Sequence, residues 1–148
     1  MGNRENVSRR EFHRSWVAGF WAAATSACAV MLARCAKTYP VKVVAHAGDI
    51  PVGGFKVFTY PTDDRPCILL RPAEESYIAF SRLCTHNSCP VHYRPQLDRL
   101  ECPCHQGAFS AVDGSVLYGP PPKPLPRVVL ERRGEELVAT GMMAGPNG

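Results

Sequence analysis

The sequence predicts an all-β domain of short antiparallel strands, preceded by a single apolar helix near the N-terminus. Among the 148 residues are 14 Pro and 12 Gly, a composition that favours turns over a helical bundle. After Ala33, no run of about 12 or more residues has helical periodicity. Because 45% of the residues are hydrophobic and 20% are charged, a folded core is expected, and the length allows one domain with short extensions.

The formal net charge of +4 does not indicate nucleic-acid binding once the charges are located along the chain. Residues 1–37 hold six basic and two acidic side chains and account for the whole excess. Residues 38–148 hold eleven side chains of each sign. The expected β domain therefore lacks the basic surface that nucleic-acid binding requires, and we expect no such partner.

The N-terminal helix is predicted by an uncharged run at residues 15–33. As a helix it would span about 28 Å, close to the roughly 30 Å hydrocarbon core of a bilayer. Arg residues are denser before the run than after it, which favours a cytoplasmic N-terminus. We expect a single-pass anchor in a bacterial cytoplasmic membrane, with the β domain on the periplasmic or outer face.

The segment Ser8-Arg9-Arg10-Glu11-Phe12, within the expected cytoplasmic region 1–14, resembles a twin-arginine export signal. Ala27-Cys28-Ala29 has the small-x-small pattern of a signal-peptide cleavage site, so residues 15–33 could instead be a removable signal. We favour the uncleaved anchor. Both alternatives export the rest of the chain.

Residues 34–47 are expected to form a hinge or tether that contains a first strand at Val41–Val44. Further strand-type runs alternate with turn clusters: Phe55–Tyr60, Ile68–Arg71, Tyr77–Ser81, Val128–Glu131 and Glu136–Thr140. The last two runs flank Arg132-Arg133-Gly134-Glu135, which predicts a hairpin. The domain is therefore expected at 48–141, followed by a flexible tail at 142–148.

Four of the seven Cys and two of the five His lie in two short boxes between these strand regions. The boxes read Cys84-Thr85-His86-Asn87-Ser88-Cys89-Pro90 and Cys102-Pro103-Cys104-His105-Gln106-Gly107. Such clustering indicates a metal site or a disulfide scaffold. Each box offers one Cys and one His, a mixed set of two thiolates and two imidazoles, and leaves one further Cys in each box.

C-T-H-x-x-C followed by C-P-C-H-x-G closely resembles the two boxes of the Rieske iron–sulfur proteins, with similarity over roughly residues 48–141. The resemblance implies an antiparallel β-sandwich and a [2Fe–2S] cluster with two Cys on one iron and two His on the other. The implied ligands are Cys84, Cys102, His86 and His105. It also implies a disulfide between Cys89 and Cys104, a feature of the branch that includes the cytochrome bc complexes.

The resemblance implies electron transfer. Two neutral imidazoles in place of two thiolates make the cluster easier to reduce. Because ferric iron lowers the pKa of a bound imidazole, reduction should be coupled to proton uptake, at His105 with His86 beside it. We expect a subunit, inactive alone, that takes an electron and a proton from quinol at a cytochrome b-type partner. It would pass the electron to a c-type cytochrome.

Two further features of the sequence refine this expectation: a proline-rich segment and the absence of two hydroxyl donors. Gly119-Pro120-Pro121-Pro122 begins a segment similar to the family's proline loop, which would shield the cluster. High-potential members carry Ser and Tyr donors where this chain has Gly107 and Phe109. We therefore expect a lower potential, suited to menaquinol.

Two other functions stay open. Asn87-Ser88 replaces the Leu-Gly common in quinol-oxidising members, which favours the small Rieske subunit of an exported molybdenum oxidoreductase similar to arsenite oxidase. The third possibility is a colourless structural zinc module. Cys28 and Cys67 are expected to be buried and inert, whereas the role of Cys35 is left open.

Overall fold

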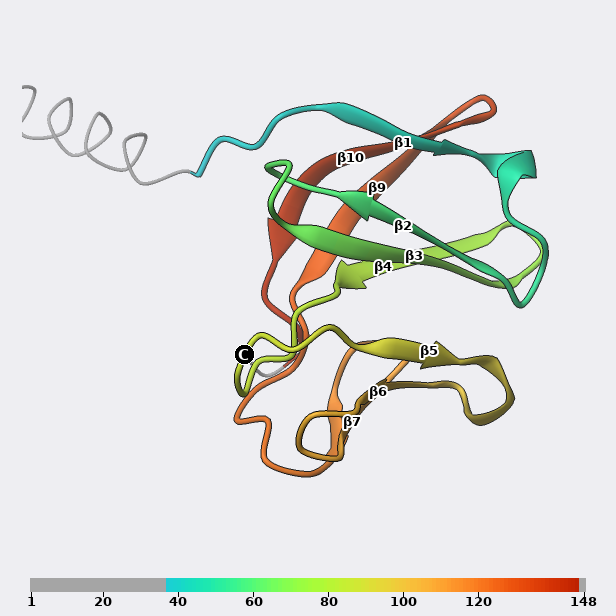
Figure 1. Ribbon diagram of the computed structural model, residues 1–148. Helices are drawn as coiled ribbons and strands as arrows, with labels where there is room; N and C mark the ends of the chain where they lie inside the picture. The colour runs from blue at the N-terminus through green and yellow to red at the C-terminus, as the bar shows by residue number, and fades with distance from the viewer. Residues whose placement is uncertain (1–36, 147–148) are drawn as a thin grey trace, which may run out of the picture. The chain divides into compact units, whose positions relative to one another are not determined.

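The computed structural model describes residues 37–146, and these residues form ten β-strands and two three-residue 3-10 helices (Figure 1). The strands are β1 (Lys42–His46), β2 (Phe55–Thr59), β3 (Pro66–Ala73), β4 (Ser76–Ser81), β5 (His92–Arg94), β6 (Arg99–Cys102), β7 (Gly107–Ser110), β8 (Val116–Tyr118), β9 (Arg127–Arg133) and β10 (Glu136–Met143). The helices are η1 (Ala47–Asp49) and η2 (Pro95–Leu97). The all-β prediction is confirmed for the described part of the chain.

The strands form two antiparallel sheets. The larger sheet has the order β1-β10-β9-β4-β3-β2, and the smaller has the order β5-β6-β7-β8. Figure 1 shows the smaller sheet below the larger one. The two outer strands of the larger sheet approach each other, since Lys42 Nζ donates to the Thr59 carbonyl at 3.2 Å and the Tyr60 hydroxyl donates to the Pro40 carbonyl at 2.9 Å.

Strand β3 explains how one chain supports two hydrophobic cores. Its residues Cys67 to Leu70 are each no more than 1% exposed. Successive side chains of a strand point to opposite faces, so a strand buried on both sides needs a continuous apolar run. Ile68 and Leu70 belong to the core cluster that reaches the smaller sheet, whereas Cys67 and Leu69 belong to the cluster of the larger sheet.

The six strands predicted from the sequence are all present; five of them are longer than predicted, and β2 ends one residue earlier. Strand β1 pairs with β10 across Lys42↔Ala139, so the strand expected within the tether at 34–47 is present and continues to His46. Strand β10 continues to Met143, into the segment expected as a tail. The sequence places the end of this strand too early because Gly141 and two Met residues lack the alternation that marks a strand. Gly141 nevertheless pairs with Val129.

The four strands of the smaller sheet were not predicted. They contain only three or four residues each, which is too short for an alternating pattern to stand out. They nevertheless determine where the second Cys/His box lies.

The predicted N-terminal helix at residues 15–33 and the export signal at Ser8–Phe12 lie outside the described residues. Within residues 37–146, no helix is long and apolar enough to cross a bilayer.

Candidate metal centre

Both Cys/His boxes form tight loops at the ends of strands. The first box follows β4 and leads to β5, and it is closed by the Cys84 N–H donating to the Cys89 carbonyl at 2.9 Å. The second box is the turn between β6 and β7, closed by pairing of Cys102 with Gly107. Ser88 and Gln106 have φ of 55° and 53°, which allows each loop to reverse within a few residues.

The two boxes bring a pair of buried thiols together. Cys84 is 3% exposed and Cys102 is 2% exposed, and the two thiols lie within hydrogen-bonding contact. Burial raises the pKa of the Cys84 thiol, since it penalises the charged form. The backbone N–H groups of His86 and Asn87 donate to the Cys84 sulfur and act in the opposite direction. The first loop therefore directs donors at a sulfur, as a bound thiolate requires.

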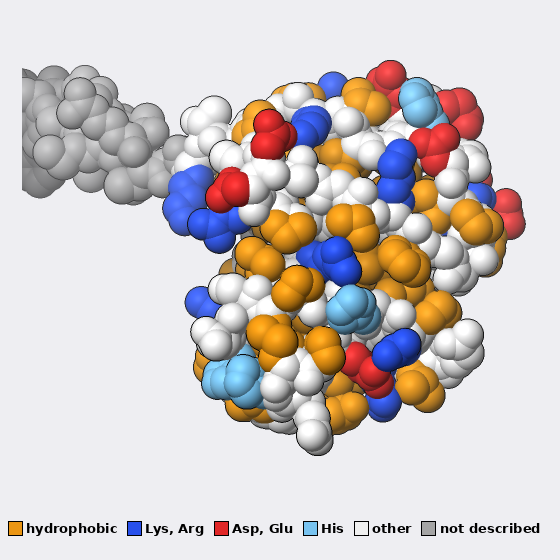
Figure 2. Space-filling model, viewed as in Figure 1, with side chains coloured by type: hydrophobic (Ala, Val, Ile, Leu, Met, Phe, Trp, Pro, Cys, Tyr) orange, Lys and Arg blue, Asp and Glu red, His pale blue; other side chains and the backbone are white. Residues whose placement is uncertain are grey.

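The His residues that neighbour these thiols in the sequence form a pair of imidazoles at the surface. The ring centroids of His86 and His105 are 4.7 Å apart with an interplanar angle of 89°, and both side chains are exposed. Figure 2 shows His side chains reaching the surface in the lower part of the domain, where Figure 1 shows the smaller sheet. Two thiols and two imidazoles on facing loops are the donor set of a mixed-ligand [2Fe–2S] centre, so these residues fit that cofactor.

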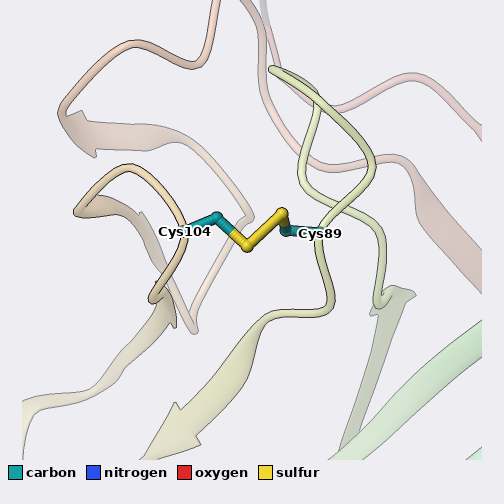
Figure 3. The surroundings of a disulfide bond; sticks show 2 residues. All are labelled: Cys89 and Cys104. Carbon is teal, nitrogen blue, oxygen red and sulfur yellow. A yellow bond between two sulfur atoms is a disulfide. The ribbon is translucent and has the colours of Figure 1, made fainter.

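The disulfide between Cys89 and Cys104 that the resemblance implies is present, with a Cα–Cα distance of 6.4 Å (Figure 3). It joins the first box to the second. The Cys102 sulfur lies within 4.8 Å of both disulfide sulfurs. These three sulfurs do not make a metal site by themselves, because the two bonded sulfurs are not thiolates.

The proline segment lies directly against the second box. Gly119 has φ of +95°, and a Cβ at this position would lie 2.6 Å from the Gly107 Cα. A Cβ on Gly107 would lie 2.8 Å from the Pro121 Cγ. This contact explains the Gly107 departure noted in the sequence, because a Ser there would require the proline segment to move.

The Thr85 hydroxyl ties the same segment to the first box by donating to the Lys123 carbonyl at 2.6 Å. Sequence reasoning missed this role, although the Thr between the Cys and His of the first box was the available signal. Of the other Cys and His residues, Cys67 is 1% exposed in the core of the larger sheet, and His46 and His92 are exposed outside both boxes.

Replacing both disulfide cysteines by Ala should lower the free energy of unfolding by about 3 kcal/mol. A disulfide stabilises chiefly by restricting the unfolded chain, and this one closes a loop with a sequence separation of 15. Urea denaturation of the chain and of the Cys89→Ala/Cys104→Ala variant measures the difference. Equal midpoints and slopes for the two proteins would show that the disulfide contributes nothing to folding.

Comparison with known proteins agrees with this geometry. Residues 41–131 match the family described as Rieske [2Fe-2S] domain. The chain is 38% identical over 82 residues to the cytochrome b6-f complex iron-sulfur subunit of Chlorobaculum tepidum, covering 55% of this chain and 43% of that protein. It is 35% identical over 96 residues to the cytochrome bc1 complex Rieske iron-sulfur subunit of Corynebacterium glutamicum, covering 59% and 23%.

A further relative is the putative respiratory nitrate reductase subunit Rieske of Haloferax mediterranei, 37% identical over 98 residues, covering 56% of this chain and 44% of that protein. Among solved structures, the plasma membrane Rieske protein PetC3 from Synechocystis PCC 6803 superposes with a TM-score of 0.59 at 26% identity, covering 68% and 99%. The chain spans less than half the length of these three curated relatives.

Proposed function

Because the chain belongs to the Rieske [2Fe-2S] family, we propose that it is a one-electron carrier within a larger oxidoreductase complex. Its cluster would be held by four residues of the two boxes: Cys84, Cys102, His86 and His105. When bound, the cluster supplies a one-electron redox couple. The observation that carries the proposal is that the two boxes together provide two buried thiols and two exposed imidazoles that lie next to each other.

Different residues of the chain have different roles at the site. The loop backbone donates hydrogen bonds to the Cys84 sulfur and keeps water from it. The exposed imidazoles of His86 and His105 would contact the electron donor and hold a proton at a ring nitrogen. The shielding segment, Gly119 to Pro122, covers the second box and offers few N–H groups that need partners.

We further propose that the donor is a quinol and that the complex is of the cytochrome bc type, with cytochrome b-type and c-type partners. Support comes from the relatives named as b6-f and bc1 subunits. Anchoring by residues 15–33, export through the Ser8–Phe12 signal and a tether before β1 complete this proposal. The head would then lie on the periplasmic or outer face of the membrane.

We propose menaquinol as the quinol. Phe109 is completely buried and carries no hydroxyl to donate to the site, and Gly107 has no side chain at all. Fewer donors to the cluster and its ligand sulfurs stabilise the reduced state less, so the potential should be lower than that of ubiquinol-oxidising members.

A second candidate is an electron-transfer subunit of an exported molybdenum oxidoreductase. The relative named as a nitrate reductase Rieske subunit favours an oxidoreductase other than a bc complex. Asn87 is exposed on the first box, at a position where quinol-oxidising members commonly carry Leu. A polar residue there suits docking against a polar partner surface better than against an apolar quinol pocket.

Low-temperature EPR of the purified full chain through a redox titration tests the proposal. We expect a rhombic signal that appears on reduction, with an average g value below that of the free electron. The midpoint then separates menaquinol from ubiquinol chemistry. A protein that is EPR-silent in both states and contains zinc would contradict electron transfer and leave a structural zinc module.

The proton-coupled part of the proposal makes a separate prediction. If each electron brings one proton to an imidazole, the midpoint potential should fall by up to about 59 mV for each unit of rising pH. Titrations at several pH values between neutral and alkaline measure this slope. A midpoint independent of pH would exclude proton uptake at His86 or His105.

A further inference from the structure

One proposed ligand, Cys102, also belongs to a cluster of three sulfurs around the disulfide. Cys102 places its sulfur within 4.8 Å of both Cys89 and Cys104 sulfurs. A thiolate next to a disulfide can attack one of its sulfurs and displace the other. The attacking sulfur must be unbound, deprotonated when it attacks, and able to reach the disulfide.

We propose that the Cys89–Cys104 disulfide rearranges when the cluster is absent, with Cys102 as the attacking residue. This inference rests on the proposed function in one respect: a bound cluster would occupy the Cys102 sulfur and prevent the attack. Loss of the cluster would free that sulfur beside the disulfide. The chain would then convert the loss of its cofactor into a change of disulfide pairing.

The structure favours one product. Attack on the Cys89 sulfur forms a Cys89–Cys102 bond, which still joins the first box to the second. Attack on the Cys104 sulfur would link two residues of the same turn and leave the boxes unjoined, which loses the stabilisation of the cross-link. Cys104 is exposed and Cys89 is half-buried, so the first reaction also releases the sulfur that water solvates best.

The exchange needs no external oxidant, because one disulfide bond forms as another breaks. The Cys102 thiol gives its proton to solvent, its sulfur bonds to Cys89, and the Cys89–Cys104 bond breaks. Cys104 leaves as a thiolate and takes up a proton. The rearranged chain has one disulfide, as before, but it presents a free thiol at the surface and lacks one of the four proposed ligands. Reloading would then require a thiol reductant or a second exchange.

Two variants of the full chain separate this reaction from simple loss of the cluster. Cys84→Ser and Cys102→Ser each remove one proposed ligand, so neither should hold a cluster. Only Cys84→Ser keeps the attacking sulfur. We expect Cys104 to be free in Cys84→Ser and to remain bonded to Cys89 in Cys102→Ser, with at least about tenfold more free Cys104 in the former.

Differential alkylation measures the pairing. Free thiols are trapped with N-ethylmaleimide in denaturant at acidic pH, where exchange is slow, and the remaining cysteines are then reduced and labelled with iodoacetamide. Trypsin, which does not cut before Pro, leaves Cys84 and Cys89 on peptide 83–99 and the other two on peptide 100–127. Fragmentation of the second peptide locates each label on Cys102 or Cys104.

Cys67 controls for unfolding, because its thiol is 1% exposed in the other core. It should stay unbridged in both variants and resist N-ethylmaleimide under native conditions. The proposal is overturned if Cys84→Ser keeps its Cys89–Cys104 bond, or if Cys67 joins the exchange. In the unmodified chain, Cys104 should become free after a chelator removes the iron. A chain purified without iron would contradict the proposed function and leave the comparison of the two variants intact.

Discussion

Cys84→Ser and Cys102→Ser should each eliminate the cluster, whereas Cys67→Ser should retain it. All three residues are buried free thiols with exposures of 1–3%, so burial alone does not distinguish them. The groups around each thiol distinguish them. Cys84 and Cys102 contact each other on facing loops, while Cys67 lies on β3 and donates to the Tyr60 carbonyl at 3.3 Å.

Cys67 and Cys84 also differ in the groups that lie against the sulfur. Burial raises the pKa of Cys67 to about 11, so this thiol stays protonated near neutral pH. Burial also raises the pKa of Cys84, although there the backbone N–H groups of His86 and Asn87 act in the opposite direction. A Ser at position 67 can keep the hydrogen bond to Tyr60, and we expect it to cost about 1 kcal/mol of folding free energy.

Iron content, visible absorption and the EPR signal of the reduced state measure cluster retention in the three variants. We expect near-complete loss for the two box variants, because a serine hydroxyl replaces a thiolate that binds iron. Urea denaturation of Cys67→Ser serves as the control for stability. A cluster that survives Cys84→Ser, or that is lost in Cys67→Ser, would contradict the proposed ligand assignment.

Most of the candidate site could be predicted from the sequence because cluster ligands and disulfides need particular residue types. The Cys and His of both boxes, the Cys89–Cys104 pairing and the proline segment all followed from residue identity and resemblance. The larger sheet was predictable for a related reason. Runs such as Cys67 to Leu70 contain the uninterrupted apolar residues that a strand buried on both faces requires.

The parts that were missed depend on packing rather than on residue type. Strands β5 to β8 are short, and antiparallel pairing with one another defines them more than any pattern of their own. The hydrogen bond from Thr85 to Lys123 joins residues 38 positions apart, so the Thr in the first box does not by itself identify its partner. The proximity of the Cys102 sulfur to the disulfide likewise results from how the two loops fold against each other.

Gly119→Ala should destabilise the domain by about 3 kcal/mol and disturb the site. Its φ of +95° lies in a region that L-residues avoid, at a cost of about 1 kcal/mol. Overlap of the new Cβ with the Gly107 Cα, at 2.6 Å, adds about 2 kcal/mol because neither atom can move away by rotation about a side-chain bond. The shielding segment must therefore shift away from the second box.

Gly53→Ala provides the matched control. Gly53 has φ of +77°, yet a Cβ there would meet no atom within 4 Å. This variant should therefore show only the backbone cost, about 1 kcal/mol, and an unchanged cluster. Urea denaturation gives the two stabilities, and the EPR line shape and midpoint potential of the reduced cluster report on the site. Because the shielding segment contacts Gly107 directly, only Gly119→Ala should change both spectroscopic readouts. If the two variants prove equally stable, with identical spectra and potentials, the segment does not pack against the second box as the structure shows.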